Sequence, residues 1–397
     1  MKVLVFAHRL ELGGTQTNAI DLAVGLRDRH GFQVVFHATP GPMQDVLRAK
    51  GLELVPAPDA RLHPSLARVR VLRELVRREK PDVIHAWDWW QGIEAYGAVH
   101  VTMRVPLIIS DMMMTLTHLL PQQVPTTFGV LAIQQQASDQ GWTRSSYLPP
   151  PVDLTANDPD IMDQRECRLA MGFSATDIAL VSVSRLSHTL KADSLARTIE
   201  TVRRLGRKLP LRLSIVGDGS ARAELQHLAT RTNRELQRKA VTLHGAMTDP
   251  RRAYAAADIV MGMGGSALRG MAFGKPVIVT GDNGFARVFD PGTAQWFSVN
   301  GIHGIGTGDR GEVMQETVSR LAMQPDLRRS LGAFGQDYVR RHHDIDQATD
   351  QLAGLCHAAC SEFTPPSIQD AARSAVIYLR ERRFRTTSRD KVLDTRS

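Results

Sequence analysis

The most informative segment of this chain is GMGGSALRGMAFGKPVIVTGDNGF, residues 262–285. It follows an apolar run at 258–261, and its pattern predicts a glycine turn, a short helix over 266–273 and a strand over 277–280. Gly274 is placed to end the helix, because glycine is common just past a helix terminus and Pro276 cannot continue it. The stretch therefore predicts a strand–helix–strand unit with a parallel pair of strands.

The glycines before this helix indicate an anion site. Gly264 and Gly265 allow the backbone to run close to a ligand, and the N–H groups of Ser266, Ala267 and Leu268 are then expected to point at that ligand. A tight turn without a ligand accounts for the same glycines equally well. The interpretation therefore depends on the rest of the chain.

Apolar runs and amphipathic helices alternate on both sides of this unit. The other predicted strands are 2–7, 33–37, 52–56, 82–85, 107–110, 130–133, 145–148, 178–184, 211–216 and 241–244. The other predicted helices include residues 20–26 and the ranges 43–50, 66–80, 194–205, 221–232, 251–256, 326–361 and 368–383. This alternation is typical of an α/β fold with doubly wound parallel sheets.

The alternation stops and restarts at the stiff Pro149-Pro-Pro151 segment, which predicts a domain boundary. We expect one Rossmann-like domain over residues 1–155 and a second over 156–340. The helices and basic tail over 341–397 are expected to pack back on the first domain. Two tandem α/β halves imply a ligand cleft between them.

Composition narrows the class of protein. With 397 residues, 43% of them hydrophobic, the chain can bury a large core, and no run approaches the ~20 apolar residues of a membrane span. The chain begins directly in a predicted strand, so we expect a cytoplasmic protein. Three cysteines cannot build a disulfide framework. Cys356 and Cys360 share a face of a predicted helix, where two buried thiols are more common than a metal site, so no metal site is predicted.

The formal net charge of +8 is weak evidence for an anionic partner, which could be a nucleic acid, a membrane surface or a small molecule. Basic residues concentrate on the predicted helix 66–80 and at 380–385, but neither cluster is interleaved with aromatic residues. A nucleic-acid partner is therefore not expected. A membrane surface is the less favoured partner, and an anionic small molecule the more favoured one.

Three further features point to the same ligand class as the opening stretch. Gly13 and Gly14 follow the first strand, and Gly217 follows the strand over 211–216. Arg185 and Lys191 follow the strand over 178–184, where the fork of an arginine and the point charge of a lysine can clamp a diphosphate. Each feature alone is weak evidence for a ligand site. All of them in this order and at this spacing are much less common by chance than any one of them.

In these features the chain resembles the GT-B glycosyltransferases of the large retaining group called GT4. The segments that carry the resemblance are GGTQ (13–16), KPDVIH (80–85), LPPPVD (148–153), SRL (184–186) with Lys191, IVGDG (215–219), YAAAD (254–258) and MAFGKPV (271–277). They cover roughly residues 1 to 360.

The resemblance implies a donor site in the second domain and an acceptor site in the first, with no divalent metal and no cofactor besides the nucleotide-sugar substrate. Arg185 and Lys191 would hold the diphosphate as catalytic residues, with backbone donors along Gly264, Gly265, Ser266, Ala267 and Leu268. Gly13, Gly14 and Gly217 would border the donor, and Gly245, Ala246 and Met247 would lie along the base. UDP is the usual nucleotide of the family, while GDP and dTDP remain open.

The departures from the family pattern concern the donor sugar. Relatives place two glutamates here with seven residues between them, whereas this chain has Met261, just before the opening stretch, and Arg269 at those positions. An arginine cannot accept hydrogen bonds from hydroxyl groups, although it can pair with phosphate or with Asp282. We therefore expect an unusual donor sugar or an altered donor pose, or else a relative that has lost activity.

The acceptor side departs as well. Many relatives carry a histidine after the strand over 107–110, whereas Asp111 follows here, and Asp111 or His118 is the candidate replacement. The motif HAWDWW (85–90) is expected to form a loop after the fourth strand, in which Trp87, Trp89 and Trp90 stack on an acceptor ring and Asp88 takes a hydroxyl or ammonium proton. Packing of these tryptophans between helices is the equally weighted alternative. Thr15 and Gln16 complete the candidate acceptor residues.

The favoured function is transfer of an unusual sugar to a small soluble acceptor, with retention, in specialised-metabolite (antibiotic) assembly. The alternatives are a peripheral membrane glycosyltransferase with a lipid acceptor, an inactive GT-B binding protein, and a nucleotide-sugar epimerase. Asp-x-Asp patterns at 158–160 and 344–346 do not follow predicted strands, which disfavours a metal-dependent GT-A enzyme. The oligomeric state is not indicated.

Overall fold

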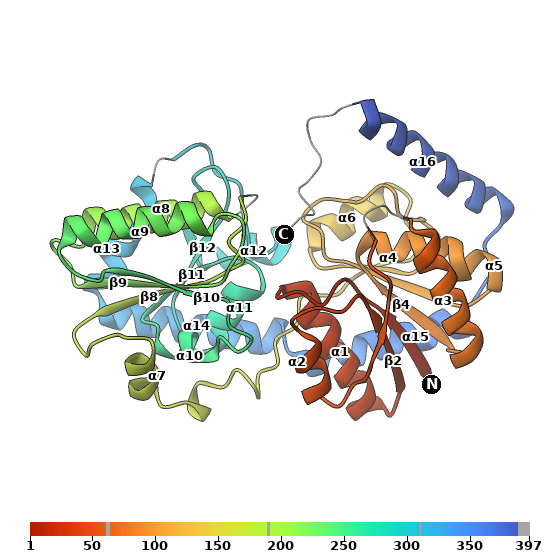
Figure 1. The fold of residues 1–397 in the computed structure, drawn as a ribbon, viewed down its shortest axis with the longest axis horizontal. Coiled ribbons are helices and arrows are strands. Elements are labelled where there is room, and N and C mark those ends of the chain that lie inside the picture. Colours follow the sequence, from red (N-terminus) through yellow and green to blue (C-terminus); the bar gives the residue numbers. More distant parts are fainter. Residues whose placement is uncertain (61–63, 189–190, 310, 388–397) are drawn as a thin grey trace. The chain divides into compact units, whose positions relative to one another are not determined.

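The computed structural model describes residues 1–60, 64–188, 191–309 and 311–387, and the chain divides into two compact units (Figure 1). Unit 1 comprises Met1–Pro151 and the helices that begin at Ile345, and unit 2 comprises Val152–Asp344. The chain therefore leaves unit 1 after Pro151 and returns to it at Ile345.

Unit 1 is built on a parallel sheet in the order β3-β2-β1-β4-β5-β6-β7. Its strands in the described residues are β1 (Lys2–Phe6), β2 (Gln33–Ala38), β3 (Leu54–Pro56), β4 (Val83–Trp87), β5 (Leu107–Asp111), β6 (Thr126–Phe128) and β7 (Ser145–Tyr147). Its helices there are α1 (Gly14–His30), α2 (Gln44–Ala49), α3 (Leu66–Glu79), α4 (Asp88–Ala95), the π-helix η1 (Tyr96–His100), α5 (Val101–Met103), α6 (Leu131–Asp139), α15 (Ile345–Ser361) and α16 (Ile368–Thr387).

Both faces of this sheet are covered, as the continuous apolar run of β1 requires. Val3 and Val5 pack with α1, α2 and α15 on one face, whereas Leu4 and Phe6 pack with α3, α4 and α6 on the other. Successive side chains of a strand point to opposite faces, so a run without polar residues is stable only between two layers of helices.

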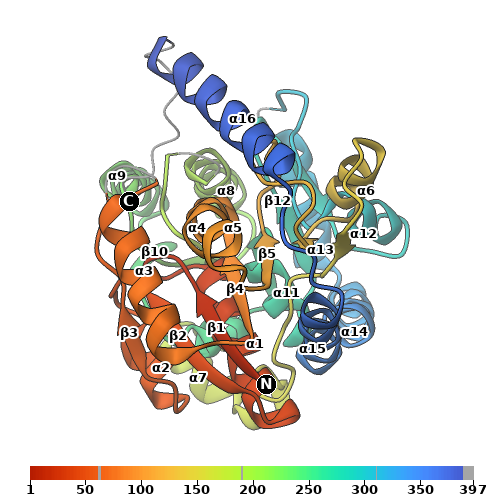
Figure 2. The same cartoon turned by 90° about the vertical axis from the view of Figure 1, so that its right-hand side faces the viewer.

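Helix α15 completes unit 1 by packing along α1, and Figure 2 follows the blue return of the chain from α15 to α16. The two helices approach so closely that a Cβ on Gly25 would lie 2.4 Å from Thr349 Oγ1. Arg29 Nε also donates to Asp350 Oδ1 at 2.7 Å. Cys356 is buried in this contact, and burial raises the pKa of its thiol to about 12.

Unit 2 has a second sheet in the order β10-β9-β8-β11-β12-β13, parallel except for the antiparallel pair β12–β13. Its strands in the described residues are β8 (Ile178–Val183), β9 (Leu211–Val216), β10 (Val241–Gly245), β11 (Ile259–Gly262), β12 (Val277–Thr280) and β13 (Ala286–Val288). Its helices there are the 3₁₀ turn η2 (Pro159–Ile161), α7 (Gln164–Ala170), α8 (Ala192–Leu205), α9 (Arg222–Leu236), α10 (Arg251–Ala256), α11 (Gly265–Ala272), α12 (Ala294–Asn300), α13 (Glu312–Met323) and α14 (Pro325–His342).

The faces of the second sheet are covered in the same way. Helices α8, α9 and α13 pack on one face, and α7, α10, α11 and α14 pack on the other, with α8 and α9 above the sheet and α10 and α14 below it in Figure 1. The β8 residues alternate between the two, because Leu180 joins the first cluster and Val181 the second. Each unit is thus a doubly wound α/β layer structure, and the predicted fold class is confirmed.

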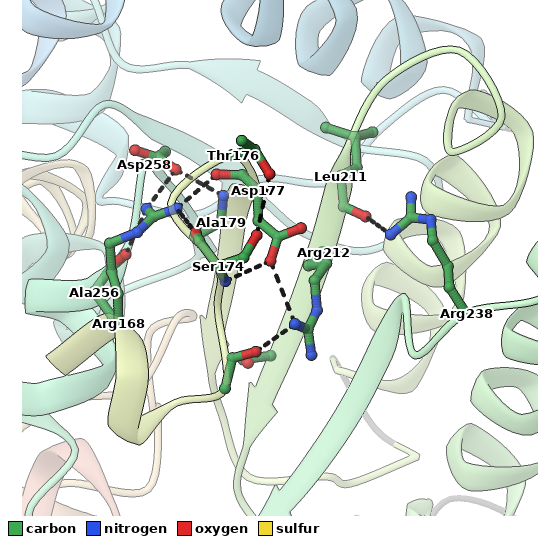
Figure 3. A network of polar contacts seen from close by, with 12 residues as sticks. Arg168, Ser174, Thr176, Asp177, Ala179, Leu211, Arg212, Arg238, Ala256 and Asp258 are labelled. Atoms are coloured by element: carbon green, nitrogen blue, oxygen red, sulfur yellow. Dashed lines mark hydrogen bonds and ion pairs between the residues drawn. The ribbon is translucent and has the colours of Figure 1, made fainter. Parts of the chain in front are cut away.

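A polar network fastens α7 to the sheet of unit 2 (Figure 3). Arg168 Nη1 donates to Asp258 Oδ2 at 2.8 Å, and its Nη2 donates to the carbonyl of Asp177 at 2.6 Å. Asp258 Oδ2 also accepts from the N–H of Ala179 at 2.7 Å. The pair therefore joins α7, the start of β8 and the start of β11.

Two predicted elements were wrong. The run 130–133 was predicted as a strand, but Val130 is the N-cap of α6 and the strand β6 lies at Thr126–Phe128. A short apolar run fits a buried helix face and a strand equally well, which explains the error. The helix predicted over 326–361 is interrupted after His342, where Asp344 instead forms a parallel bridge with Val152.

Candidate functional site

The carboxyl edge of the unit 2 sheet gathers several predicted site residues. Strands β8, β11 and β12 are parallel neighbours, so the segments that follow them emerge at one edge. Arg185 and Lys191 follow β8, α11 follows β11, and Asp282 follows β12. Ligands of open α/β sheets bind at this edge, and the topology brings these groups to it.

Lys191 is the N-cap residue of α8. Burial and the nearby Arg185 guanidinium lower the pKa of the Lys191 ammonium to about 8, while Asp282 opposes the shift. Two cations held together in a partly dehydrated place repel each other, and an anion bound between them relieves that repulsion. The charge arrangement suits a diphosphate.

The first turn of α11 offers backbone donors at the same edge. Gly264, the N-cap, has φ of 54°, a left-handed conformation that favours glycine, and its N–H donates to the Ile302 carbonyl at 2.6 Å. The N–H of Leu268 donates to the Gly264 carbonyl at 3.1 Å, so the expectation that it faces a ligand was wrong. The available donors of the first turn are those of Gly265, Ser266 and Ala267, because helix geometry leaves them without a partner.

The side chains of this turn are also placed. The Ser266 hydroxyl accepts a hydrogen bond from Tyr254 Oη at 3.1 Å. Arg269 folds back along α11, with Nη1 donating to the Gly265 carbonyl at 3.3 Å. The sequence allowed a pair between Arg269 and Asp282, but the Asp282 carboxyl instead interacts with Lys191, Asp193 and Arg197, and burial raises its pKa. The guanidinium of Arg269 thus lies at the N-terminus of α11.

One of the predicted glycines, Gly217, has a packing role. A Cβ on Gly217 would lie 1.8 Å from the Ser184 carbonyl oxygen, and φ of Gly217 is 147°. Its N–H donates to the Gly245 carbonyl at 2.7 Å. The glycine at 217 is therefore required by the close approach of two loops, whether or not a ligand is bound. Beyond Gly245, Ala246 is exposed and Met247 packs partly against the core.

In unit 1, the glycine loop after β1 leads directly into α1. Gly14 is exposed, and a Cβ there would meet no atom within 4 Å. Gln16 Nε2 donates back to the Arg9 carbonyl at 3.2 Å, and Thr15 lies half-buried beside it. Among the described residues of unit 1, no close contact requires a glycine at position 14, in contrast to Gly217.

The carboxyl ends of β4 and β5 bring Asp88 and Asp111 to the edge of the unit 1 sheet. Asp111 is buried, and burial together with the Asp88 charge raises the pKa of its carboxyl to about 7. Asp88 Oδ2 lies 2.7 Å from Nε2 of His8, which follows β1. His118 is exposed. Asp111 is therefore the better supported of the two predicted acceptor-side replacements.

The aromatic acceptor loop is not present as predicted. Trp87 is the last residue of β4 and is fully buried, while Trp89 is 8% exposed in the core on the other face of the sheet. Helix α4 begins immediately at Asp88, so the segment has no loop in which the rings could face a ligand. Trp90 is half-buried and stacks on Trp89 with ring centroids 3.7 Å apart. The packing alternative describes these rings.

Sequence reasoning missed His8 and His303. His303 lies in the loop after α12, and the pKa of its imidazole is lowered by burial and by Lys191, which places it near that ammonium. No local motif marks it. His8 does carry a signal, since it follows β1 by two residues, and the ends of parallel strands are where ligand-binding groups collect.

Two Rossmann-like units, each with its polar groups at the carboxyl edge of its sheet, define the GT-B class of glycosyltransferases. The comparisons with known proteins give the family. The model described as Glycosyl transferases group 1 matches residues 177–321, and the model described as Glycosyltransferase Family 4 matches residues 12–111. Together they span more than half of the sequence, and the chain belongs to this GT4-like family of glycosyltransferases.

Solved structures agree with this fold. The protein Alr3699/HepE of Anabaena, in complex with UDP-glucose, is 16% identical with a TM-score of 0.70, and the match covers 90% of this chain and 100% of that one. Sucrose-phosphate synthase of Thermosynechococcus elongatus is 14% identical with a TM-score of 0.69, covering 91% and 99%. A glycosyltransferase of Rickettsia africae is 12% identical with a TM-score of 0.69, covering 90% and 98%. A comparison with curated protein sequences gave no significant match.

None of the helices in the described part of the chain has the length and apolar character needed to cross a membrane. Over the same residues, no three His, Cys, Asp or Glu side chains gather closely enough to hold a metal ion.

Proposed function

We propose that this glycosyltransferase moves a sugar from a nucleoside-diphosphate donor, bound at the carboxyl edge of unit 2, to a small soluble acceptor bound at the carboxyl edge of unit 1. The observation that carries the proposal is the convergence of Arg185, Lys191 and the first turn of α11 after the neighbouring strands β8 and β11. Two cations and a helix N-terminus at one sheet edge suit a diphosphate.

The chemistry proposed is electrostatic. The bond between the anomeric carbon and the diphosphate oxygen breaks with its electron pair staying on the oxygen, and Arg185, Lys191 and the α11 donors stabilise that charge. The acceptor hydroxyl oxygen forms the new bond to the anomeric carbon from the side that the diphosphate leaves, and its proton passes to the departing diphosphate. This course retains the anomeric configuration and uses protein cations for the role that a divalent metal plays elsewhere.

Asp111 is proposed to orient the acceptor. Its Oδ2 is buried and makes no hydrogen bond with any described residue. A buried acceptor atom without a partner is costly, and a hydroxyl donated by a ligand removes that cost. Gly13, Gly14, Thr15 and Gln16 lie after β1, next to β4 in the same sheet, and would border the acceptor and the transferred sugar.

The donor is proposed to carry uridine and an unusual sugar. HepE of Anabaena was solved with UDP and with UDP-glucose, which favours uridine over guanosine or thymidine. Arg269, held at the Gly265 carbonyl, presents a cation where relatives carry a carboxylate that meets ribose hydroxyls. A donor with an additional anionic or acceptor group near this position would match it. We place the reaction in specialised-metabolite (antibiotic) assembly in the cytoplasm.

The test begins with binding. Calorimetry with UDP, GDP and dTDP should show micromolar to millimolar binding of one nucleotide, and Arg185→Ala and Lys191→Ala should each weaken it by roughly 10–100-fold, as expected for a lost charged hydrogen bond. Arg207→Ala is the matched control, because Arg207 is exposed in the loop between α8 and β9, at the opposite edge of the sheet.

Transfer is then measured with a panel of nucleotide sugars and soluble acceptors. Binding without turnover on the whole panel would indicate an inactive binding protein, and product formed without an acceptor would indicate an epimerase. Transfer that requires anionic lipid vesicles would indicate a membrane-surface enzyme. Arg269→Glu should shift donor preference toward a common UDP-hexose, and an unchanged preference would remove the role given to Arg269.

A further inference from the structure

Three side chains of unit 1 gather at the carboxyl ends of adjacent strands. His8 follows β1, Asp88 follows β4 and begins α4, and Asp111 ends β5. Asp88 connects the other two segments, because its Oδ2 lies 2.7 Å from His8 Nε2 and its Oδ1 accepts from the Met112 N–H at 2.9 Å. The residue after Asp111 is thus held by the carboxylate that pairs with the imidazole.

Asp88 adopts a conformation that needs support. Its φ is 60°, in the left-handed region, which costs a residue with a Cβ about 1–2 kcal/mol. Its side chain is 9% exposed, whereas that of His8 is 27% exposed. The two hydrogen bonds hold this backbone conformation, and the imidazole is the member of the group that solvent reaches. Strained residues of this kind concentrate at functional sites.

Asp111 depends on the charge of its neighbour. Its Oδ1 accepts from the Met113 N–H at 3.3 Å, while Oδ2 has no hydrogen bond with a described residue. Burial is the largest cause of the raised pKa of Asp111, the Asp88 charge raises that pKa further, and Thr117 and the Met113 N–H lower it. From the neighbouring strand, His85 adds no charge, since it is bonded to Ser110 and burial lowers its pKa to about 3.

We propose that His8 is a positioning residue for Asp111: by pairing with Asp88 it sets how much negative charge Asp111 meets, and so decides whether Asp111 presents a carboxylate or a carboxylic acid. A protonated imidazole offsets the Asp88 charge, and two carboxylates can then coexist. A neutral imidazole leaves that charge uncompensated, and the charge then adds to the effect of burial in keeping the proton on Asp111. No proton passes between the residues, because the effect is electrostatic. The inference rests on the proposed function only in taking the ligand of Asp111 to be the sugar acceptor.

The same mechanism predicts opposite effects of two conservative variants. Asp88→Asn removes the negative charge while its amide oxygen can still accept from the Met112 N–H, so the pKa of Asp111 should fall by about one unit or more. His8→Gln keeps a hydrogen-bond donor but removes the compensating positive charge, so the pKa of Asp111 should rise by about one unit.

The direct test needs no substrate. The carboxyl ¹³C resonance of Asp111, assigned by its loss in Asp111→Asn, is titrated in the wild-type full chain labelled at aspartate and in both variants. His30→Gln is the matched control, because His30 forms the same kind of pair with Asp350 at 2.8 Å on α1, remote from this sheet edge, and should leave the titration unchanged. Melting temperatures show that each variant is folded.

The second readout is the acid limb of the pH profile of kcat/KM, which should move down in Asp88→Asn and up in His8→Gln. A role in packing alone would lower activity at all pH values without opposite displacements. The proposal is overturned if the Asp111 titration is the same in His8→Gln as in the wild type, or if both variants move it in one direction. A wild type that transfers no sugar would overturn the proposed function. The titration of the Asp111 carboxyl resonance would still show whether His8 changes the pKa of Asp111.

Discussion

Lys191 shows at the scale of one residue how the fold adjusts a charge. Burial and Arg185 lower the pKa of its ammonium to about 8, so the side chain is charged below that pH and loses its proton as the pH rises through it. A bound diphosphate would favour the charged form. Donor binding would then require the proton, and the affinity should fall above pH 8.

The dissociation constant of UDP should therefore rise by up to about tenfold per pH unit between pH 8 and 9.5 in the wild type. Lys191→Arg should flatten this dependence, because a guanidinium remains charged throughout. Calorimetry at constant ionic strength measures both curves. Parallel curves for the two proteins would show that Lys191 does not contact the diphosphate.

Two glycines should separate a packing role from a ligand role. Gly217→Ala places a Cβ against the Ser184 carbonyl at a φ of 147°, and we expect it to destabilise unit 2 by at least about 3 kcal/mol, or roughly 6–12 °C in Tm. Gly14→Ala enters open space at the start of α1, so its Tm should change little while sugar transfer falls. If calorimetry shows that Gly217→Ala and Gly14→Ala lower Tm equally, the two glycines do not differ in their packing roles.

At the scale of elements, α7 is held on unit 2 by the Arg168–Asp258 pair. The two side chains are 14% and 21% exposed, so removing the guanidinium leaves a largely buried carboxylate without its counter-charge. Arg168→Met should destabilise unit 2 by about 3 kcal/mol. Urea unfolding followed by fluorescence measures the change.

Arg231→Met is the control for that experiment. Its pair with Glu235 on α9 is 52% and 37% exposed, and exposed pairs contribute less than about 1 kcal/mol. Similar free energies of unfolding for the two variants would mean that burial of the Arg168 pair contributes nothing.

The elements that sequence predicted well are those with a local cause. Strands β9 and β12 were predicted at their observed bounds, because each is an apolar run limited by proline or glycine. Helix α4 and the π-helix η1 were not predicted. Asp88 begins α4 with a positive φ that its bonds to His8 and Met112 support, and no local pattern reports such contacts.

The candidate site also has a part that local sequence predicts and a part that it does not. The donor side follows from glycines and cations close to strand ends, which a sequence displays. The acceptor side depends on which strands are neighbours and on which way side chains point. For the three indoles of residues 87–90 the sequence therefore left packing and ligand contact equally weighted, and it did not indicate His8, which is 80 positions from its partner Asp88.

At the scale of the whole molecule, unit 1 is made from two separate parts of the chain. Helix α15 covers the apolar face of α1, with Ala348, Leu352 and Cys356 in the shared core. A fragment of residues 1–151 lacks that cover, so it should aggregate or bind hydrophobic dyes when produced alone. Residues 152–344 should fold as an independent unit.

Co-expression of residues 345–397 should restore a soluble unit 1, and the restored complex should show a cooperative thermal transition. Gly25→Leu in α1, where a Cβ already meets Thr349, is the matched variant that should prevent the rescue. A fragment of residues 1–151 that is monomeric and unfolds cooperatively would contradict the dependence on α15.

The return of the chain to unit 1 at Ile345 also sets an order of events during synthesis. A ribosome that has finished residue 151 must still make all of unit 2 before α15 emerges, which takes roughly 10–40 s at ordinary rates of elongation. During that interval unit 1 lacks α15 in the helix layer on one face of its sheet, while unit 2 can fold on the ribosome. The second unit to begin is thus the first that can finish, and the exposed face of α1 is the place where a nascent-chain chaperone would be needed.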